Sequence, residues 1–261
     1  MPMTDFLATA SRLADAARIE TLNHAGGAQV DGKGGGDVFD PVTAGDRATE
    51  RRLRDLIAAE YPDHAIAGEE YPYTAGESRF EWSLDPIDGT RSYVCGLPTW
   101  TILIALLESG RPVLGIIDVP CLDERYAGCG GRAWSLSAGV EKPLEVSRCT
   151  DLAAARLSTT DPFLFTGSAA ISFDTLRRSV RITRYGHDAY AYARLAAGTL
   201  DLVVECGLKP HDYNALIPVV RGAGGIFGNW CGGEDFAQGN VIAAATPQLY
   251  EAAVAVMGAS R

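Results

Sequence analysis

The residues best suited to chemistry are the paired carboxylates of the segment Asp85-Pro86-Ile87-Asp88-Gly89-Thr90. An apolar run at residues 82–84 predicts a strand that delivers Asp85 to its end. We expect Pro86 to stop this strand, because proline fixes its own φ and favours an extended residue before it. A sharp bend then returns Asp88 toward the same space. Two carboxylates placed in this way are suited to holding a divalent cation.

Three backbone features of the same segment add to this interpretation. The carbonyl of Ile87 lies between the two carboxylates, and Gly89 lets the backbone approach a ligand closely. We expect Thr90 to cap a short helix, whose free N–H groups would face an anion. Such a set suits hard cations bridged to phosphate. A bare DxxD pattern also fits a β-turn followed by a helix cap, so the surrounding sequence has to decide.

Three further acidic segments are candidates for the same site. Gly68-Glu69-Glu70 follows a predicted strand, Asp46 lies at the start of a predicted helix, and Asp212 follows His211 at the start of another. Each has a simpler explanation alone, since paired glutamates are usually surface charge and Thr43, Asp46 or Asp212 can cap a helix. Carboxylates crowded without a metal would repel one another and rise in pKa, so a purely structural cluster is costly.

Hydrophobic periodicity predicts the elements that must position these residues. In the first half, two helices precede strands that follow one another directly, and turns at 108–112 and 128–131 predict antiparallel hairpins. In the second half, strands and helices alternate. The predicted helices are 4–22, 44–60, 168–179, 189–197, 212–222 and 247–257, and the predicted strands are 64–68, 80–84, 99–107, 113–119, 156–160, 180–185, 200–205 and 240–245.

The change of pattern near residue 145 predicts two halves. Residues 1–145 form an α+β half that carries most of the candidate metal ligands. Residues 146–261 form an α/β half that carries Asp212 and the substrate-side residues. A chain of 261 residues can bury enough surface for both to pack as one compact unit. The glycine-rich stretch 31–37 is too short for a linker between domains and is expected to form a loop that lies over another part of the protein.

Composition excludes several classes of function. A net charge of −10 argues against a nucleic-acid or anionic-membrane surface. No apolar run is long enough to span a membrane, and the N-terminus has no export signal, so we expect a cytoplasmic protein. The six cysteines show no CxxC pair or zinc-finger spacing and are expected to be reduced and mostly buried.

Four segments together resemble the inositol-monophosphatase-like superfamily of metal-dependent phosphatases. They are PVTAGD (41–46), GEE (68–70), DPIDGT (85–90) and HDYNALIPVVRGAGG (211–225), and they occur in the expected order along nearly the whole chain. The resemblance implies an α/β fold with alternating layers, αβαβα, and a site between the two halves. It also implies hydrolysis of a small phosphate monoester with two or three Mg²⁺ ions, and a homodimer.

The resemblance also implies a role for each matching residue. Metal-activated water would attack the phosphate, and Asp46 and Thr90 would orient it. Gly89, Thr90 and Asp212 would contact the substrate. The metal ligands implied for one ion are Glu69, Asp85 and the Ile87 carbonyl, those for a second are Asp85, Asp88 and Asp212, and Asp46 would support a weaker third ion.

The substrate has to be inferred from other residues. Asp188 and Glu205 match positions on the substrate side, and the segments KGGGDVFDPVT (33–43), YGHDAYAY (185–192) and GLKPHDYNALIPVVRGAGG (207–225) resemble the histidinol-phosphate phosphatases of the superfamily. Two carboxylates would pair with the ammonium and imidazole of histidinol phosphate. Asp188 is equally suited to capping the helix predicted from residue 189.

Alternatives remain open at this point. An inositol-1-phosphate or broader sugar-phosphate phosphatase would use the same machinery, and a degenerate metal-binding regulatory module is the non-enzymatic alternative. His211 replaces the aromatic residue expected before Asp212, and no role is assigned to His187, His211 or Lys33.

Overall fold

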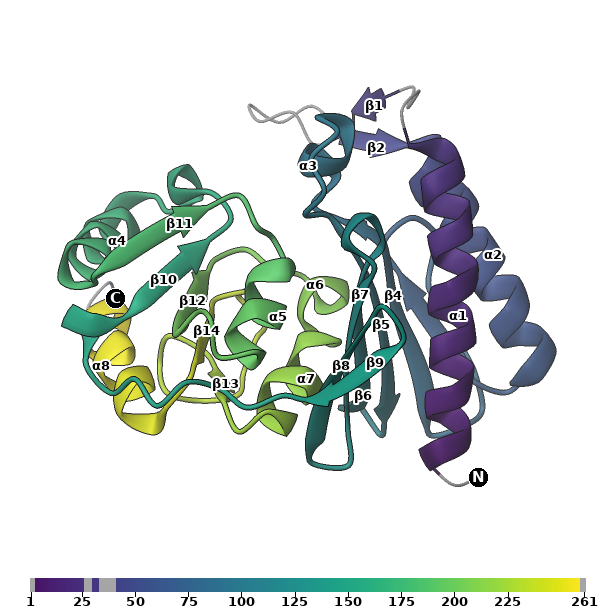
Figure 1. The fold of residues 1–261 in the computed structure, drawn as a ribbon. Coiled ribbons are helices and arrows are strands. Elements are labelled where there is room, and N and C mark those ends of the chain that lie inside the picture. The colour runs from purple at the N-terminus through teal and green to yellow at the C-terminus, as the bar shows by residue number, and fades with distance from the viewer. Residues whose placement is uncertain (1–2, 26–29, 33–40, 259–261) are drawn as a thin grey trace.

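The computed structural model describes residues 3–25, 30–32 and 41–258, and it has five layers (Figure 1). Lys33 and most of the glycine-rich stretch lie outside the described residues. The order of the layers is helices, sheet, helices, sheet, helices, which confirms the predicted αβαβα fold. No helix among the described residues is long and apolar enough to cross a membrane.

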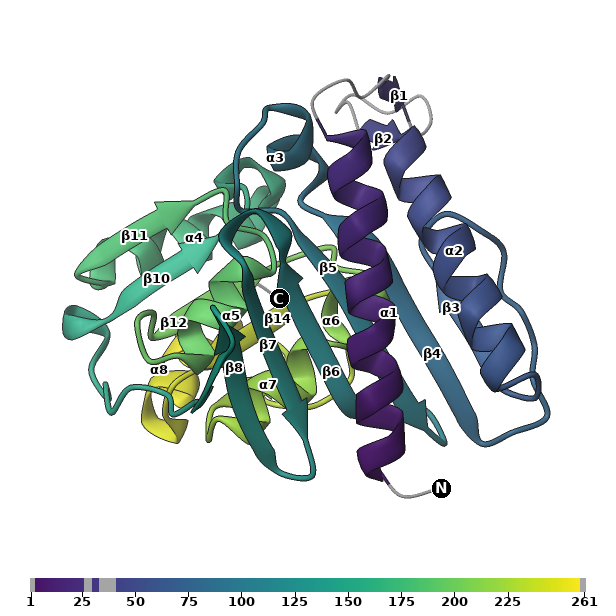
Figure 2. The ribbon, with the colours of Figure 1, turned by 45° about the vertical axis from the view of Figure 1, so that its right-hand side comes forward.

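The outer helical layer consists of α1 (Met3–His24) and α2 (Ala44–Glu60), which lie side by side on one face of a seven-stranded sheet (Figure 2). The strand order is β3-β4-β5-β6-β7-β8-β9, and all neighbours are antiparallel except β3 and β4. The strands are β3 (Ala65–Gly68), β4 (Phe80–Asp88), β5 (Thr101–Glu108), β6 (Arg111–Val119), β7 (Glu124–Cys129), β8 (Arg132–Ser137) and β9 (Val140–Pro143).

The other face of that sheet packs on a middle layer of short helices, α5 (Tyr190–Ala196), α6 (Pro210–Tyr213) and α7 (Leu216–Gly222). A five-stranded sheet follows, in the order β11-β10-β12-β14-β13, and α4 (Gly167–Ser179) and α8 (Pro247–Met257) cover it. Its strands are β10 (Arg156–Thr159), β11 (Ile182–Tyr185), β12 (Leu202–Glu205), β13 (Ile226–Gly228) and β14 (Val241–Ala244).

This layering explains why the strands are apolar on both faces. Along β5, Ile102 and Ile104 pack toward α1 and α2, whereas Leu103 and Ala105 pack toward the middle helices. A strand buried on both sides loses the usual alternation of polar and apolar residues. The predicted helix, strand and hairpin pattern is largely confirmed. The division into halves at residue 145 stays a prediction.

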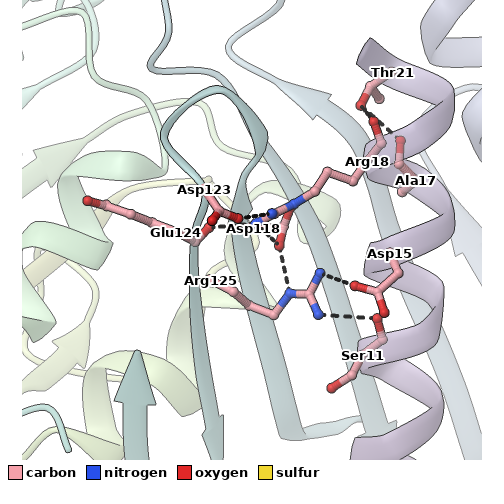
Figure 3. A network of polar contacts seen from close by, with 9 residues as sticks. All are labelled: Ser11, Asp15, Ala17, Arg18, Thr21, Asp118, Asp123, Glu124 and Arg125. Atoms are coloured by element: carbon pink, nitrogen blue, oxygen red, sulfur yellow. Dashed lines mark hydrogen bonds and ion pairs between the residues drawn. The ribbon is translucent and has the colours of Figure 1, made fainter. Parts of the chain in front are cut away.

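A buried ion network attaches α1 to the sheet (Figure 3). Arg18 donates from Nε to Asp118 Oδ2 at 2.8 Å, and Arg125 donates from Nε to Asp118 Oδ1 at 2.6 Å. Arg18 also pairs with Asp123, and Arg125 pairs with Asp15. The fully buried carboxylate of Asp118 therefore serves two guanidinium groups from two different elements.

Several sequence predictions were wrong in detail. Pro86 does not stop β4, which runs on to Asp88 because one extra residue between Asp85 and Asp88 is accommodated as a β-bulge. The helix predicted at 212–222 is two helices, α6 and α7. Pro218 has no N–H to donate to the carbonyl of Asn214, and its ring would clash with that carbonyl, so the helix breaks at residues 214–215 and resumes at Leu216.

Other features were missed altogether. Residues 30–32 and 41–43 form a two-stranded ribbon, β1 (Val30–Gly32) with β2 (Pro41–Thr43), and β9 and β13 were also not predicted. None of the cysteines is buried: Cys95, Cys121 and Cys231 are exposed and the other three are half-buried. The exposed ones lie in turns or at helix ends, where little packs over them.

Candidate active site

The bulge at the end of β4 shapes the segment that carries the first two carboxylates. Asp85 is buried, and its Oδ1 accepts a hydrogen bond from Ile87 N at 3.1 Å. Thr90 Oγ1 donates to the Ile87 carbonyl at 3.1 Å, so its hydroxyl turns back to the loop instead of capping a helix. The capping residue of α3 (Thr90–Val94) is Gly89, at φ 80°, which corrects the expected role of Thr90.

Three carboxylates, two from β4 and one from α6, converge at this loop. One oxygen each from Asp85, Asp88 and Asp212 lies within 4.8 Å of the others. Burial raises the pKa of Asp85 and Asp88 well above the usual range, and the neighbouring negative charges raise it further. Such a cluster is stabilised by a divalent cation, which removes both the repulsion and the cost of burial.

Asp88 also joins the halves directly. Its Oδ2 accepts from the backbone N–H of Ala189 at 2.7 Å and from Thr101 Oγ1 at 3.2 Å. The two donors come from different elements, one from the residue before α5 and one from β5. The position of the Asp88 carboxylate is therefore fixed before any ligand binds.

Asp46 is buried at the start of α2, and only one of its two carboxylate oxygens accepts hydrogen bonds from described residues. Its Oδ2 accepts from Thr43 N at 2.8 Å and Thr43 Oγ1 at 2.6 Å in a capping box. Its Oδ1 is buried and has no hydrogen-bond partner among the described residues. Burial, with smaller effects from Glu70 and Glu69, raises the pKa of Asp46 to about 6. A buried oxygen in this state fits a cation or a bound water.

Glu69 is positioned by a residue that sequence reasoning missed. Glu50 of α2 is fully buried, and its carboxylate accepts from the N–H of Glu70 at 2.7 Å and that of Tyr71 at 3.2 Å. A Cβ on Gly68 would lie only 2.1 Å from Glu50 Oε1, so a larger residue there would displace the Glu50 carboxylate from this position. The available signal was a glutamate on the buried stripe of a predicted helix.

A pocket of about 200 Å³ opens over this cluster. It collects eight of the predicted residues but not Asp46 or Glu205. It also includes Arg91, Thr160, Leu164 and Lys209, which sequence reasoning missed, and His211, to which no role had been assigned. The predicted residues that line it are Glu69, Asp85, Ile87, Asp88, Gly89, Thr90, Asp188 and Asp212.

Asp188 faces the pocket and does not cap α5, so the capping alternative is wrong. The capping position is Ala189, with no side-chain cap. Asp188 Oδ2 accepts from Ser92 Oγ at 3.3 Å, and burial raises the pKa of its carboxyl group. Asp188 has a left-handed φ of 47°, which asparagine and aspartate tolerate better than most residues. The carboxylate therefore lies beside Gly89, at the end of the loop that carries Asp85 and Asp88.

Glu205 is fully buried behind Thr160. Its Oε1 accepts from Thr160 N at 2.7 Å and Thr160 Oγ1 at 3.0 Å, and its Oε2 accepts from Thr159 Oγ1 at 3.0 Å. Burial raises its pKa to about 8. Glu205 thus holds the pocket residue Thr160 in place. His187 is half-buried beside it, with Nδ1 3.4 Å from Ser158 Oγ.

The donor set of this site fits Mg²⁺. Magnesium prefers carboxylate and carbonyl oxygens, and the loop at 85–88, Glu69 and Asp212 present such atoms to one small pocket. The unpartnered Oδ1 of Asp46 adds a further buried oxygen close to Glu69 and Glu70.

Comparison with known proteins supports the phosphatase family that the sequence segments indicated. The model of the inositol monophosphatase family matches residues 3–260, which confirms the resemblance found from the four segments. Bifunctional phosphatase IMPL2 of Arabidopsis thaliana is 43% identical over 198 residues, a stretch that covers 75% of this chain and 56% of that protein. Histidinol-phosphatase of Chlorobaculum parvum is 31% identical over 98% of both chains.

A solved structure agrees over the full length. An inositol monophosphatase from Zymomonas mobilis has a TM-score of 0.85 and 36% identity, and the match covers 99% of each chain. The fold is therefore that of a solved inositol monophosphatase, whereas the sequence relatives are named for more than one substrate.

Proposed function

Because the chain belongs to the inositol monophosphatase family, whose members are phosphoric monoester hydrolases, we propose that it hydrolyses L-histidinol phosphate to L-histidinol and phosphate with Mg²⁺. This would place it in histidine biosynthesis. The observation that carries the reaction is the convergence of Asp85, Asp88 and Asp212. The observation that carries the substrate is the carboxylate of Asp188, which lines the same pocket beside Gly89.

One set of residues is proposed to bind the metal ions, and another to position the attacking water and the phosphate. The residues that would hold Mg²⁺ are Glu69, Asp85, Ile87 through its carbonyl, Asp88 and Asp212, and Asp46 would support a third ion. When bound, Mg²⁺ lowers the pKa of the attacking water and stabilises charge on the leaving oxygen. Thr90 and Asp46 hold that water, and the backbone at Gly89 faces the phosphate. The hydroxyl of Thr90 donates to the Ile87 carbonyl, so its lone pairs remain to accept from water.

Substrate choice rests on charge. Histidinol phosphate carries an ammonium group at its organic end, and a buried carboxylate such as Asp188 favours a cation over a neutral polyol. Glu205 does not line the pocket but accepts two hydrogen bonds from Thr160, which does, and so holds that residue in position. Inositol 1-phosphate is the second candidate, because the similar Zymomonas mobilis structure is described as an inositol monophosphatase.

A substrate panel with Mg²⁺ tests the proposal. We expect kcat/KM for histidinol phosphate to exceed that for inositol 1-phosphate and for simple sugar phosphates. A clear preference for inositol 1-phosphate contradicts the assigned substrate but leaves the phosphatase intact. Absence of phosphate release across the panel contradicts the proposed reaction and favours the metal-binding module. The cytoplasmic location and the homodimer also stay proposals, and light scattering on the purified protein tests the homodimer.

A further inference from the structure

His211 lies between two carboxylates from different halves of the molecule. Its Nε2 is 3.4 Å from Asp212 Oδ1 and 3.9 Å from Glu69 Oε1. The side chain is only 14% exposed and lines the pocket. Glu69 follows β3 of the first sheet, whereas Asp212 is on α6. A single nitrogen therefore lies within reach of two candidate metal ligands.

These distances are unsuited to direct hydrogen bonds. An N–H···O bond joins its heavy atoms at about 2.7–3.2 Å, and both separations exceed that range. Two ligands of one cation, each about 2.1 Å from it, can lie up to about 4.2 Å apart. Both separations fall below this limit. Each separation therefore allows His211 Nε2 and the facing carboxylate oxygen to bind the same cation.

Only one carboxylate oxygen of Asp212 accepts the hydrogen bond from the backbone, and the other, Oδ1, is directed toward His211. Asp212 Oδ2 accepts from the N–H of Lys209 at 2.7 Å, a local bond that fixes the carboxylate on α6. Oδ1 is the oxygen nearer to His211 Nε2. The carboxylate therefore presents Oδ1 to the same space as the imidazole.

We infer that His211 is a nitrogen ligand of a divalent cation bound beside Asp212, at the edge of the Asp85, Asp88 and Asp212 cluster. This inference rests on the proposed metal site. A set of oxygens alone suits Mg²⁺, whereas imidazole raises the affinity for Mn²⁺ and Zn²⁺ relative to Mg²⁺. The site is therefore a mixed nitrogen and oxygen site that selects Mn²⁺ over Mg²⁺ more strongly than its carboxylates would alone.

Bound Mn²⁺ tests this directly. Electron spin-echo envelope modulation detects a nitrogen nucleus bonded to Mn²⁺, independently of turnover. We expect a nitrogen coupling in the wild-type protein that His211→Gln abolishes. We also expect His211→Gln to weaken Mn²⁺ binding by about tenfold or more and Mg²⁺ binding by much less, as measured by calorimetry.

His187→Gln is the matched control, because His187 is another half-buried histidine on the substrate side. It should keep both the coupling and the Mn²⁺ affinity. Wild-type protein that binds Mn²⁺ without a nitrogen coupling overturns the inference and leaves the proposed function standing. Equal weakening of Mn²⁺ and Mg²⁺ by His211→Gln also overturns it, since a merely structural role would produce that result. Failure of the wild-type protein to bind Mn²⁺ or Mg²⁺ contradicts the metal site itself, and the inference with it.

Discussion

Gly89 and Asp188 are in contact across the two halves of the molecule. A Cβ added to Gly89 would lie 2.7 Å from Asp188 Oδ2. Gly89 is in the loop that carries Asp85 and Asp88, whereas Asp188 precedes α5. The loop proposed to hold the metals and the residue proposed to select the substrate therefore share one wall of the pocket, and a change in either affects the other.

Gly89→Ala should impair turnover more than folding. The left-handed φ of 80° costs alanine about 1–2 kcal/mol, and its methyl group would push Asp188 aside. We expect kcat/KM to fall at least about tenfold while the thermal midpoint drops modestly. Gly110→Ala is the matched control, since its φ is 77° but nothing lies within 4 Å of its Cβ position. A similar fall in activity for both variants would show that contact with Asp188 is unimportant.

Asp188→Ala should change substrate preference. A charge-assisted hydrogen bond contributes about 1.5–3 kcal/mol, so kcat/KM for histidinol phosphate should fall by about 10- to 100-fold. Small neutral phosphate esters lack the ammonium group and should be affected much less. Steady-state kinetics with both kinds of substrate measure the ratio. Equal losses for both would contradict the proposed contact with the cation.

Asp88→Asn should abolish Mg²⁺-dependent phosphate release without unfolding the protein. The amide oxygen can still accept from Ala189 N and Thr101 Oγ1, but the negative charge toward the metal is lost. We expect turnover to fall by more than about 100-fold and the thermal midpoint to stay close to wild type. Asp174→Asn, on the exposed face of α4, is the control. Wild-type activity in Asp88→Asn would refute the metal assignment.

The parts of the site that are local in sequence could be predicted. Asp85 and Asp88 lie three residues apart, so the motif could predict that their carboxylates come together. The hydrogen bonds that fix Asp88 come from Ala189 and Thr101, which the motif could not predict. Asp188 was found only through family resemblance, because its contact with Gly89 depends on how the halves pack. Nothing in the local pattern excludes a helix cap at Asp188. The positive φ at Asp188, which turns its side chain into the pocket, depends on that packing.

The missed residues share one physical cause. Glu50 and Thr160 act on Glu69 and on the pocket wall through contacts with residues distant in sequence, and no local pattern reports such contacts. The break between α6 and α7 was different, since Pro218 could have predicted it. Periodicity alone favoured one continuous helix through that region.

Stability of the metal-free protein should fall as pH rises from about 6.5 to 8. Burial raises the pKa of Glu205 to about 8, whereas glutamate in an unfolded chain titrates near 4.3. In this range the folded state binds more protons than the unfolded state, so the free energy of unfolding decreases with pH. Burial lowers the pKa of His64 and His187, which opposes this trend only below about pH 6.5.

Urea unfolding in EDTA across this range measures the effect. Glu205→Gln cannot ionise and should flatten the decline, while saturating Mg²⁺ should restore stability at pH 8 by binding the folded state. Stability that rises with pH in the metal-free wild-type protein would contradict the raised pKa values.

Asp118→Asn should destabilise the fold without touching the chemistry. None of the nine residues drawn in Figure 3 lines the pocket. Asp118 is fully buried and neutralises Arg18 and Arg125 together, so loss of its charge leaves two guanidinium groups poorly paired between α1 and the sheet. We expect the free energy of unfolding to fall by about 3 kcal/mol.

Asp123→Asn provides the contrast, because its side chain is 70% exposed and pairs only with Arg18 in this network. Asparagine also tolerates the left-handed backbone of residue 123. An exposed pair contributes at most about 1 kcal/mol, so this variant should stay within that distance of wild type in chemical denaturation. Both variants should keep wild-type kcat/KM well below their melting temperatures. Equal stability of Asp118→Asn and Asp123→Asn would mean that the buried carboxylate does not determine how α1 attaches to the sheet.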